Sequence, residues 1–118
     1  RPEPPSVPSS AQRIHLQAPG VADVVGEPDS QLYWQRRDDG RVVLELREGI
    51  AWVRRAAGGA ELGVIAGGDE VVLAGTCTRI EVTRRLLSVD ATIDDVECGR
   101  VDEAIEQVRA ELSDAGPR

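Results

Sequence analysis

Short runs of alternating apolar residues, each interrupted by glycine, fill the stretch 41–82. The clearest run begins at Val42, and its two faces carry different side chains. Val42, Leu44 and Leu46 share one face, and Val43, Glu45 and Arg47 share the other. A period of two is typical of a strand with one buried face. The pattern predicts a β-rich scaffold, and it contains no catalytic constellation.

The bulk composition fits this interpretation and argues against one class of partner. A chain of 118 residues is long enough for one domain with a real core. Hydrophobic residues make up 41% of the sequence but aromatic residues only 3%, so aliphatic side chains must fill the interior, as suits strands. The net charge is −7, which argues against nucleic acid because phosphate binding requires a basic face.

The N-terminal segment 1–12 differs from the rest of the chain. It contains four prolines and three serines and almost no apolar side chains. Such a composition cannot repay the entropy of ordering, so the segment is expected to be a flexible linker. The chain begins with arginine and has no run of about 20 apolar residues that would span a bilayer. We therefore expect a processed protein or an excised piece, which leaves open an upstream signal or anchor.

Turn signals divide the first half of the chain into short strands. Weak strand patterns at 14–16 and 21–25 precede an aromatic strand at 30–36. Asp38-Asp39-Gly40 then predicts a two-residue hairpin turn into the strand that begins at Val42.

Glycines divide the second half in the same way. Glu48-Gly49 is expected to interrupt the strand, and turns are expected at 57–60 and 67–69. The stretch 71–82 is long enough for one bent strand or for two strands, with Gly75 as the bulge or corner.

The last strand pattern has the most regular alternation in the chain. Leu87, Val89, Ala91 and Ile93 share one face, and Ser88, Asp90 and Thr92 share the other. We expect the apolar face to be buried and the polar face to be wet. Val89 is therefore expected to be a core residue like Leu44, whereas Glu45 and Ser88 should tolerate change.

From Asp102 the period changes to that of a helix. The apolar positions at helical spacing are Ile105, Val108 and Leu112. Asp102 and Glu103 would lie at the positive end of the helix dipole, and Gly116-Pro117 is a stop signal. The sequence predicts an amphipathic helix over 102–113, which must dock on the sheet because so short a helix is marginal alone.

Few side chains could carry chemistry. His15 is the only histidine and lies beside the expected linker, so a nucleophile activated by histidine is disfavoured. The acidic pairs Asp38-Asp39, Asp69-Glu70 and Asp94-Asp95 follow or form turns, where aspartate is favoured for backbone hydrogen bonding.

The three aromatic residues are the candidate binding residues. Tyr33 and Trp34 are adjacent, so they must point to opposite faces of their strand, and at most one of them can be in the core. Trp34 and Trp52 are the candidate anchors for a protein partner, since tryptophan is enriched in binding hot spots.

The two cysteines allow two interpretations. Cys77 and Cys98 are 21 positions apart, which matches no zinc or thioredoxin-type spacing. Both lie in an apolar context, so they form either a disulfide or two buried thiols, and the residues favour buried thiols.

Three segments carry a family resemblance. They are LELREGIAWVRR at 44–55, ELGVIAGGDEVVLAGT at 61–76 and VECGRV at 96–101. Their acidic-Gly pair, Gly-Thr corner and closing acidic-Gly-Val motif resemble the FecR family of bacterial envelope proteins, over roughly residues 14–101. Cys77 and Cys98 both stand where the chain departs from that pattern.

The resemblance implies a short solenoid-like or sandwich-like β domain over 13–101, located in the periplasm, that binds other envelope proteins. Many FecR-like proteins carry a cytoplasmic anti-sigma region and a membrane helix ahead of this domain, and neither falls within these residues. The periplasm would also place the cysteines in an oxidising compartment.

The leading hypothesis is a non-enzymatic envelope domain that binds a protein partner, either as the sensory part of a membrane-anchored regulator or as an assembly scaffold. It implies no cofactor and no metal, and membrane contact only through an anchor outside this chain. The alternative is a carbohydrate- or peptidoglycan-binding module that uses Trp34 or Trp52.

Overall fold

The computed structural model describes residues 13–58 and 61–114, with side chains up to residue 111. The expected linker at 1–12 and the expected stop signal at 116–117 lie outside the described residues. So do part of the glycine turn at 57–60 and the side chain of Leu112.

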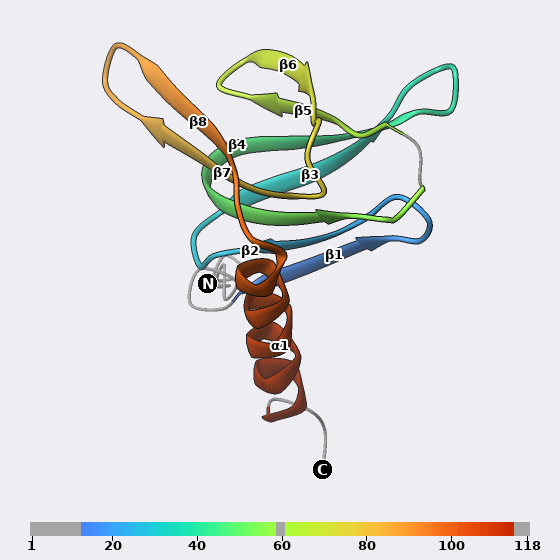
Figure 1. Cartoon of the computed structure of the whole chain (residues 1–118). Helices are drawn as coiled ribbons and strands as arrows, with labels where there is room; N and C mark the ends of the chain where they lie inside the picture. The colour runs from blue at the N-terminus through green and yellow to red at the C-terminus, as the bar shows by residue number, and fades with distance from the viewer. Residues whose placement is uncertain (1–12, 59–60, 115–118) are drawn as a thin grey trace, which may run out of the picture.

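Eight strands followed by one helix make up the described chain (Figure 1). They are β1 (Ile14–Ala18), β2 (Ala22–Gly26), β3 (Gln31–Arg36), β4 (Val42–Arg55), β5 (Gly63–Ala66), β6 (Asp69–Val72), β7 (Cys77–Arg84), β8 (Val89–Asp95) and α1 (Cys98–Asp114). The expectation of a mainly β domain with one C-terminal helix is confirmed.

Strand β4 belongs to two layers of the sheet. Its first half, up to Glu48, pairs with β3 and, in parallel, with β5, which in turn pairs with β6. Its second half, from Gly49, pairs with β2 and β7, and these extend to β1 and β8. The two halves fold toward each other in Figure 1. The sheet is not closed, because in the described residues its outermost strands β1, β3, β6 and β8 each pair with one strand only.

Gly49 makes the bend in β4 possible. Its φ of 111° is one that only glycine adopts readily. A Cβ at this position would lie 2.6 Å from the Cα of Ser30, so the backbones approach too closely for any side chain. The Ser30 hydroxyl holds the bend by accepting from the N–H of Ile50 and donating to its carbonyl, both at 3.0 Å. The expected interruption at Glu48-Gly49 is therefore a bend within one continuous strand.

The main core lies between the two layers. The first layer contributes Leu44, Leu46, Val64 and Ala66, and the second contributes Val24, Ala51, Val53, Ile80 and Val82. The expectation for the start of β4 is wrong at one position, because Val43 is also buried, at 1% exposure. It lies on the outer face of the layer and packs against Gly63, which has no side chain to hold it off.

The turns lie where the sequence predicts them, although the strands between them differ in detail. The turn between β3 and β4 is confirmed, although its loop has three residues, with Gly40 at φ 88°. Gly67 and Gly68 both have positive φ in the turn between β5 and β6. The stretch 71–82 forms two strands rather than one, with Gly75 in the connection.

The expected burial of β8 is wrong. Every residue from Val89 to Asp95 is exposed, and Leu86 and Leu87 before it are 96% and 94% exposed. The apolar residues of β8 face the same side as the core residues of β7, but the first layer does not extend over them. Gly67, in the turn between β5 and β6, is the part of that layer that reaches Ala91.

Helix α1 covers the outer face of the second layer. Its buried stripe forms a second apolar cluster, made of Val25, Cys77, Val101, Ala104, Ile105 and Val108. The helix begins at Cys98, four residues earlier than expected, so Asp102 and Glu103 do not lie in its first turn. Instead of capping the dipole, Asp102 pairs with Arg54 on β4, at 2.6 Å.

Replacing Gly49 by alanine should lower the free energy of unfolding by at least about 2 kcal/mol, because it combines backbone strain with the clash against Ser30. Gly68→Ala is the matched control, since its φ is 92° but no atom lies within 4 Å of the added Cβ. It should cost only about 1 kcal/mol. Urea unfolding measures both, and equal losses would mean that the close approach at Ser30 does not constrain the bend.

Truncation to alanine should destabilise the protein much more at Leu44 than at Val89, although the sequence predicts that both are core residues. Leu44→Ala should destabilise by about 3 kcal/mol because the side chain is fully buried. Val89→Ala should cost less than about 1 kcal/mol because that side chain is 37% exposed. Denaturant unfolding of both variants checks this, and a large loss at Val89 would contradict the open position of β8.

Candidate functional site

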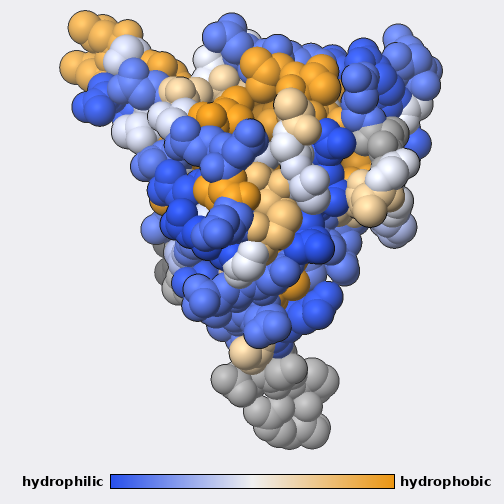
Figure 2. All heavy atoms as spheres, viewed as in Figure 1, coloured by the Kyte–Doolittle hydropathy of each residue, from blue (hydrophilic) through white to orange (hydrophobic). Residues whose placement is uncertain are grey.

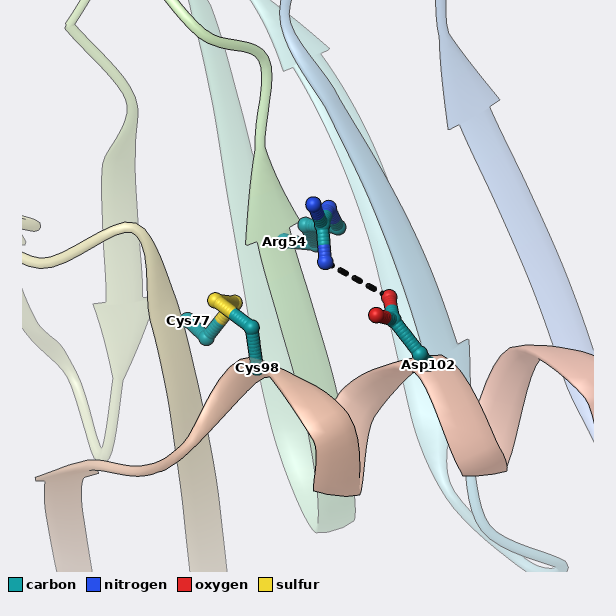
Figure 3. Close-up of a disulfide and its surroundings, with 4 residues drawn as sticks. All are labelled: Arg54, Cys77, Cys98 and Asp102. Carbon is teal, nitrogen blue, oxygen red and sulfur yellow. Dashed lines mark hydrogen bonds and ion pairs between the residues drawn. A yellow bond between two sulfur atoms is a disulfide. The ribbon is translucent and has the colours of Figure 1, made fainter.

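A disulfide joins the start of β7 to the first residue of α1. Cys77 and Cys98 are bonded, with their Cα atoms 5.2 Å apart (Figure 3). The preference for two buried thiols is therefore wrong. The fold brings the two cysteines together because β8 returns antiparallel to β7 and ends beside the residue at which β7 begins. Together with the ion pair between Arg54 and Asp102, the bond fixes the first turns of the helix against the sheet.

Trp52 lies beside this junction, beneath α1. Its Nε1–H donates to Glu27 at 2.8 Å, and its ring packs against the second apolar cluster. The guanidinium groups of Arg79 and Arg100 lie 5.6 and 5.2 Å from the centre of the ring. Arg100 is on α1, so its contact helps to hold the helix on the sheet, whereas Arg79 belongs to the neighbouring strand β7. Glu27, the two arginines and the second apolar cluster surround the indole ring. Trp52 is therefore half-buried and does not offer an open face on which a ligand could stack.

Trp34 lines an open groove at the other candidate position. The groove has a volume of about 630 Å³ and lies between the turn that joins β1 to β2 and the hairpin that joins β3 to β4. Its apolar wall includes Trp34, Val21 and Val42, and Gln17 and Gln35 also line it. Trp34 is half-buried because its ring packs against the main core.

The structure does not bring the two tryptophans together. Trp34 packs against the core between the layers, whereas Trp52 packs beneath the helix on the outer face. The expectation that Tyr33 and Trp34 point to opposite faces agrees with the burial, because Tyr33 is 44% exposed. A role for either tryptophan in binding a partner stays a prediction.

The remaining candidates form no recognisable catalytic arrangement. His15 lies 3.6 Å from Asp23, on the strand paired with its own. Asp39 accepts from the backbone N–H of Arg41 in the hairpin turn, and this bond lowers the pKa of Asp39. Over residues 13–58 and 61–114, no group of three or more His, Cys, Asp and Glu side chains is placed to hold a metal ion.

Exposed apolar side chains gather around the open ends of the sheet. The large ones are Tyr33, Val71, Val72, Leu86, Leu87, Val89 and Ile93. Figure 2 shows apolar surface over β6 and at the end of the hairpin formed by β7 and β8. Patches of this kind mark interaction surfaces in soluble domains. We call the strands β6 and β8 with their exposed Val71, Val72, Val89 and Ile93 the open edge.

The sequence did not predict the open edge, because an edge strand with an uncovered face has the same alternation of side chains as a strand whose face packs on a second layer. The backbone of Val96 donates to the carbonyl of Cys77 at 3.0 Å, just beyond the end of the β7–β8 ladder. Hydrogen-bonded pairs alternate along such a ladder, so the backbone groups of Ala91 and Ile93 point away from β7. No strand within the described part of the chain pairs with that side of β8.

A polar cluster flanks the open edge on the outer face of the first layer. Arg47 donates to Glu45 at 3.1 Å and lies 4.6 Å above the ring of Tyr33. The hydrogen bond from Arg47 is the main cause that lowers the pKa of Glu45, and Gln35 contributes a second bond at 2.7 Å. The carboxylate is therefore held ionised, which keeps Arg47 in place over the aromatic ring.

Comparison with family models, with curated proteins and with solved structures finds no match to the chain. In residues 13–58 and 61–114, no helix has both the length and the apolar character needed to cross a bilayer.

The disulfide should make a measurable contribution to stability. Replacing Cys77 and Cys98 together by alanine should lower the free energy of unfolding by about 3 kcal/mol, as expected for a closed loop of this length. A reducing agent should destabilise the wild-type chain similarly and leave the double variant unchanged. Thiol titration of the denatured, unreduced protein should find close to no free thiol, and two thiols per chain would contradict the bond.

Proposed function

We propose that this chain is a non-catalytic domain of the bacterial envelope that binds a protein partner, as the extracytoplasmic part of a FecR-like regulator or as an assembly scaffold. The observation that carries the proposal is the open edge. Two strands at free ends of the sheet expose aliphatic side chains, which a folded partner could bury.

The open edge has the chemistry of a strand-recognition surface. A partner in extended conformation would meet the outward N–H and carbonyl groups of Ile93 and place apolar side chains against Val89 and Ile93, which share one face of β8. Main-chain hydrogen bonds would then supply affinity, and the alternate side chains would supply specificity. The nearby Tyr33 and Arg47 are residue types that are enriched in such interfaces.

Two further features support an envelope location. The disulfide between Cys77 and Cys98 is of a kind that persists in oxidising compartments and is rare in the cytosol. The motifs that resemble the FecR family lie at structural positions: the acidic-Gly pair at the bend of β4, and the Gly-Thr corner at 75–76 beside the disulfide. They therefore support a shared scaffold rather than a shared active site.

A carbohydrate- or peptidoglycan-binding function is the second candidate. The groove beside Trp34 favours it, because an indole wall can stack on the face of a sugar ring. That groove is lined by the turn from β1 to β2 and the hairpin from β3 to β4, so it is a different surface from the open edge.

Site-specific photocrosslinking tests the leading proposal in the organism that makes the protein. A benzophenone amino acid at Val72 should form a covalent adduct with one envelope protein, because Val72 is 51% exposed on the free strand β6. The same amino acid at Glu106, on the exposed side of α1, is the matched control and should give no adduct.

An adduct that forms equally at both positions, or at neither, would contradict a partner on the open edge. Quenching of tryptophan fluorescence by muropeptides, abolished by Trp34→Ala, would instead support the carbohydrate candidate.

A further inference from the structure

The tip of the hairpin between β7 and β8 carries the two most exposed large apolar side chains of the described residues. Leu86 and Leu87 are 96% and 94% exposed, so both side chains are almost as open to water as in an unfolded peptide. Figure 1 shows the hairpin projecting from the body, and Figure 2 shows its apolar end. The tip is convex and narrow, unlike the open edge beside it.

Two arginines directly precede the two leucines. Residues 82–89 contain Arg84 and Arg85 and no carboxylate, in a chain of net charge −7. Arg85 pairs with Asp90 at 2.7 Å, below the tip. The Nε of Arg84 donates to the carbonyl of Arg47 at 3.2 Å.

We propose that this tip inserts into an anionic bilayer surface, with the two leucines among the acyl chains and the arginines at the lipid phosphates. Apolar side chains with adjacent basic groups are the usual means by which a protein lies in the interface without spanning it. A protein pocket is the less favoured occupant, because leucine is under-represented among the residues that dominate protein interfaces.

The charge distribution of the whole chain would also turn the hairpin tip toward an anionic bilayer. The segment 94–118 holds 8 acidic and 3 basic residues, and α1 lies at the opposite end of the molecule from the hairpin (Figure 1). An anionic surface therefore repels the helix and attracts the tip. The contact is additional to any upstream anchor, and it uses residues outside the open edge, so it does not rest on the proposed protein-binding function.

Vesicle flotation of the full 118-residue chain tests the proposal. The chain should float with vesicles of phosphatidylglycerol and phosphatidylcholine, and much less with vesicles of phosphatidylcholine alone. The double variant L86S/L87S should lower the partition coefficient at least about tenfold, because it removes the inserted apolar groups. The double variant R84Q/R85Q should also lower it, by roughly tenfold. Val72→Ser makes a comparable change on β6 and should leave it unchanged.

Each alternative gives a different result. Loss of binding in R84Q/R85Q but not in L86S/L87S would mean adsorption by charge alone and would overturn insertion. Insertion would also be overturned if the wild-type chain did not bind anionic vesicles. The same holds if light scattering found a dimer that L86S/L87S converts to a monomer.

A Leu87→Trp variant gives a second readout of insertion. The fluorescence of the added tryptophan should shift to the blue when anionic vesicles are present, and no shift would contradict insertion. The Val72 crosslink is unaffected by any of these outcomes.

Discussion

The close approach of Gly49 to Ser30 is the contact on which the rest of the fold depends. It lets one strand of 14 residues bend without ending, so that β4 pairs with four other strands in two layers. The main core exists because these layers face each other, and a straight β4 would leave both apolar faces open. The Ser30 hydroxyl bonds to both the N–H and the carbonyl of Ile50 beside the bend.

The helix depends on a second set of non-local contacts. It contributes Val101, Ile105 and Val108 to an apolar cluster on the outer face, where β2 and β7 provide the matching surface. The disulfide anchors its first residue, and cation–π contacts at Trp52 close the side of the junction. These features explain why an acidic helix that would be marginal alone is held on the sheet.

The same architecture leaves one side of the sheet unfinished. The second layer has an outer strand, β8, over which the first layer does not extend beyond Gly67. The aliphatic side chains of β8, and the two leucines before it, are consequently exposed to solvent. Natural sheets usually protect such edges with charge, proline or a covering segment. A domain whose apolar edge stays uncovered has a surface suited to binding, and that surface is made by other elements than those that line the groove of Trp34.

The sequence alone determined the features that depend on local periodicity. Alternation located the strands, glycine located the turns and the bend, and the change of period located the helix stripe at Ile105 and Val108, because these patterns reflect backbone geometry within a few residues. Only the tertiary structure decided which faces are covered. The burial of Val43, the exposure of Val89 and the bond from Cys77 to Cys98 all depend on which distant segment lies opposite, and periodicity within one strand carries no information about its neighbours.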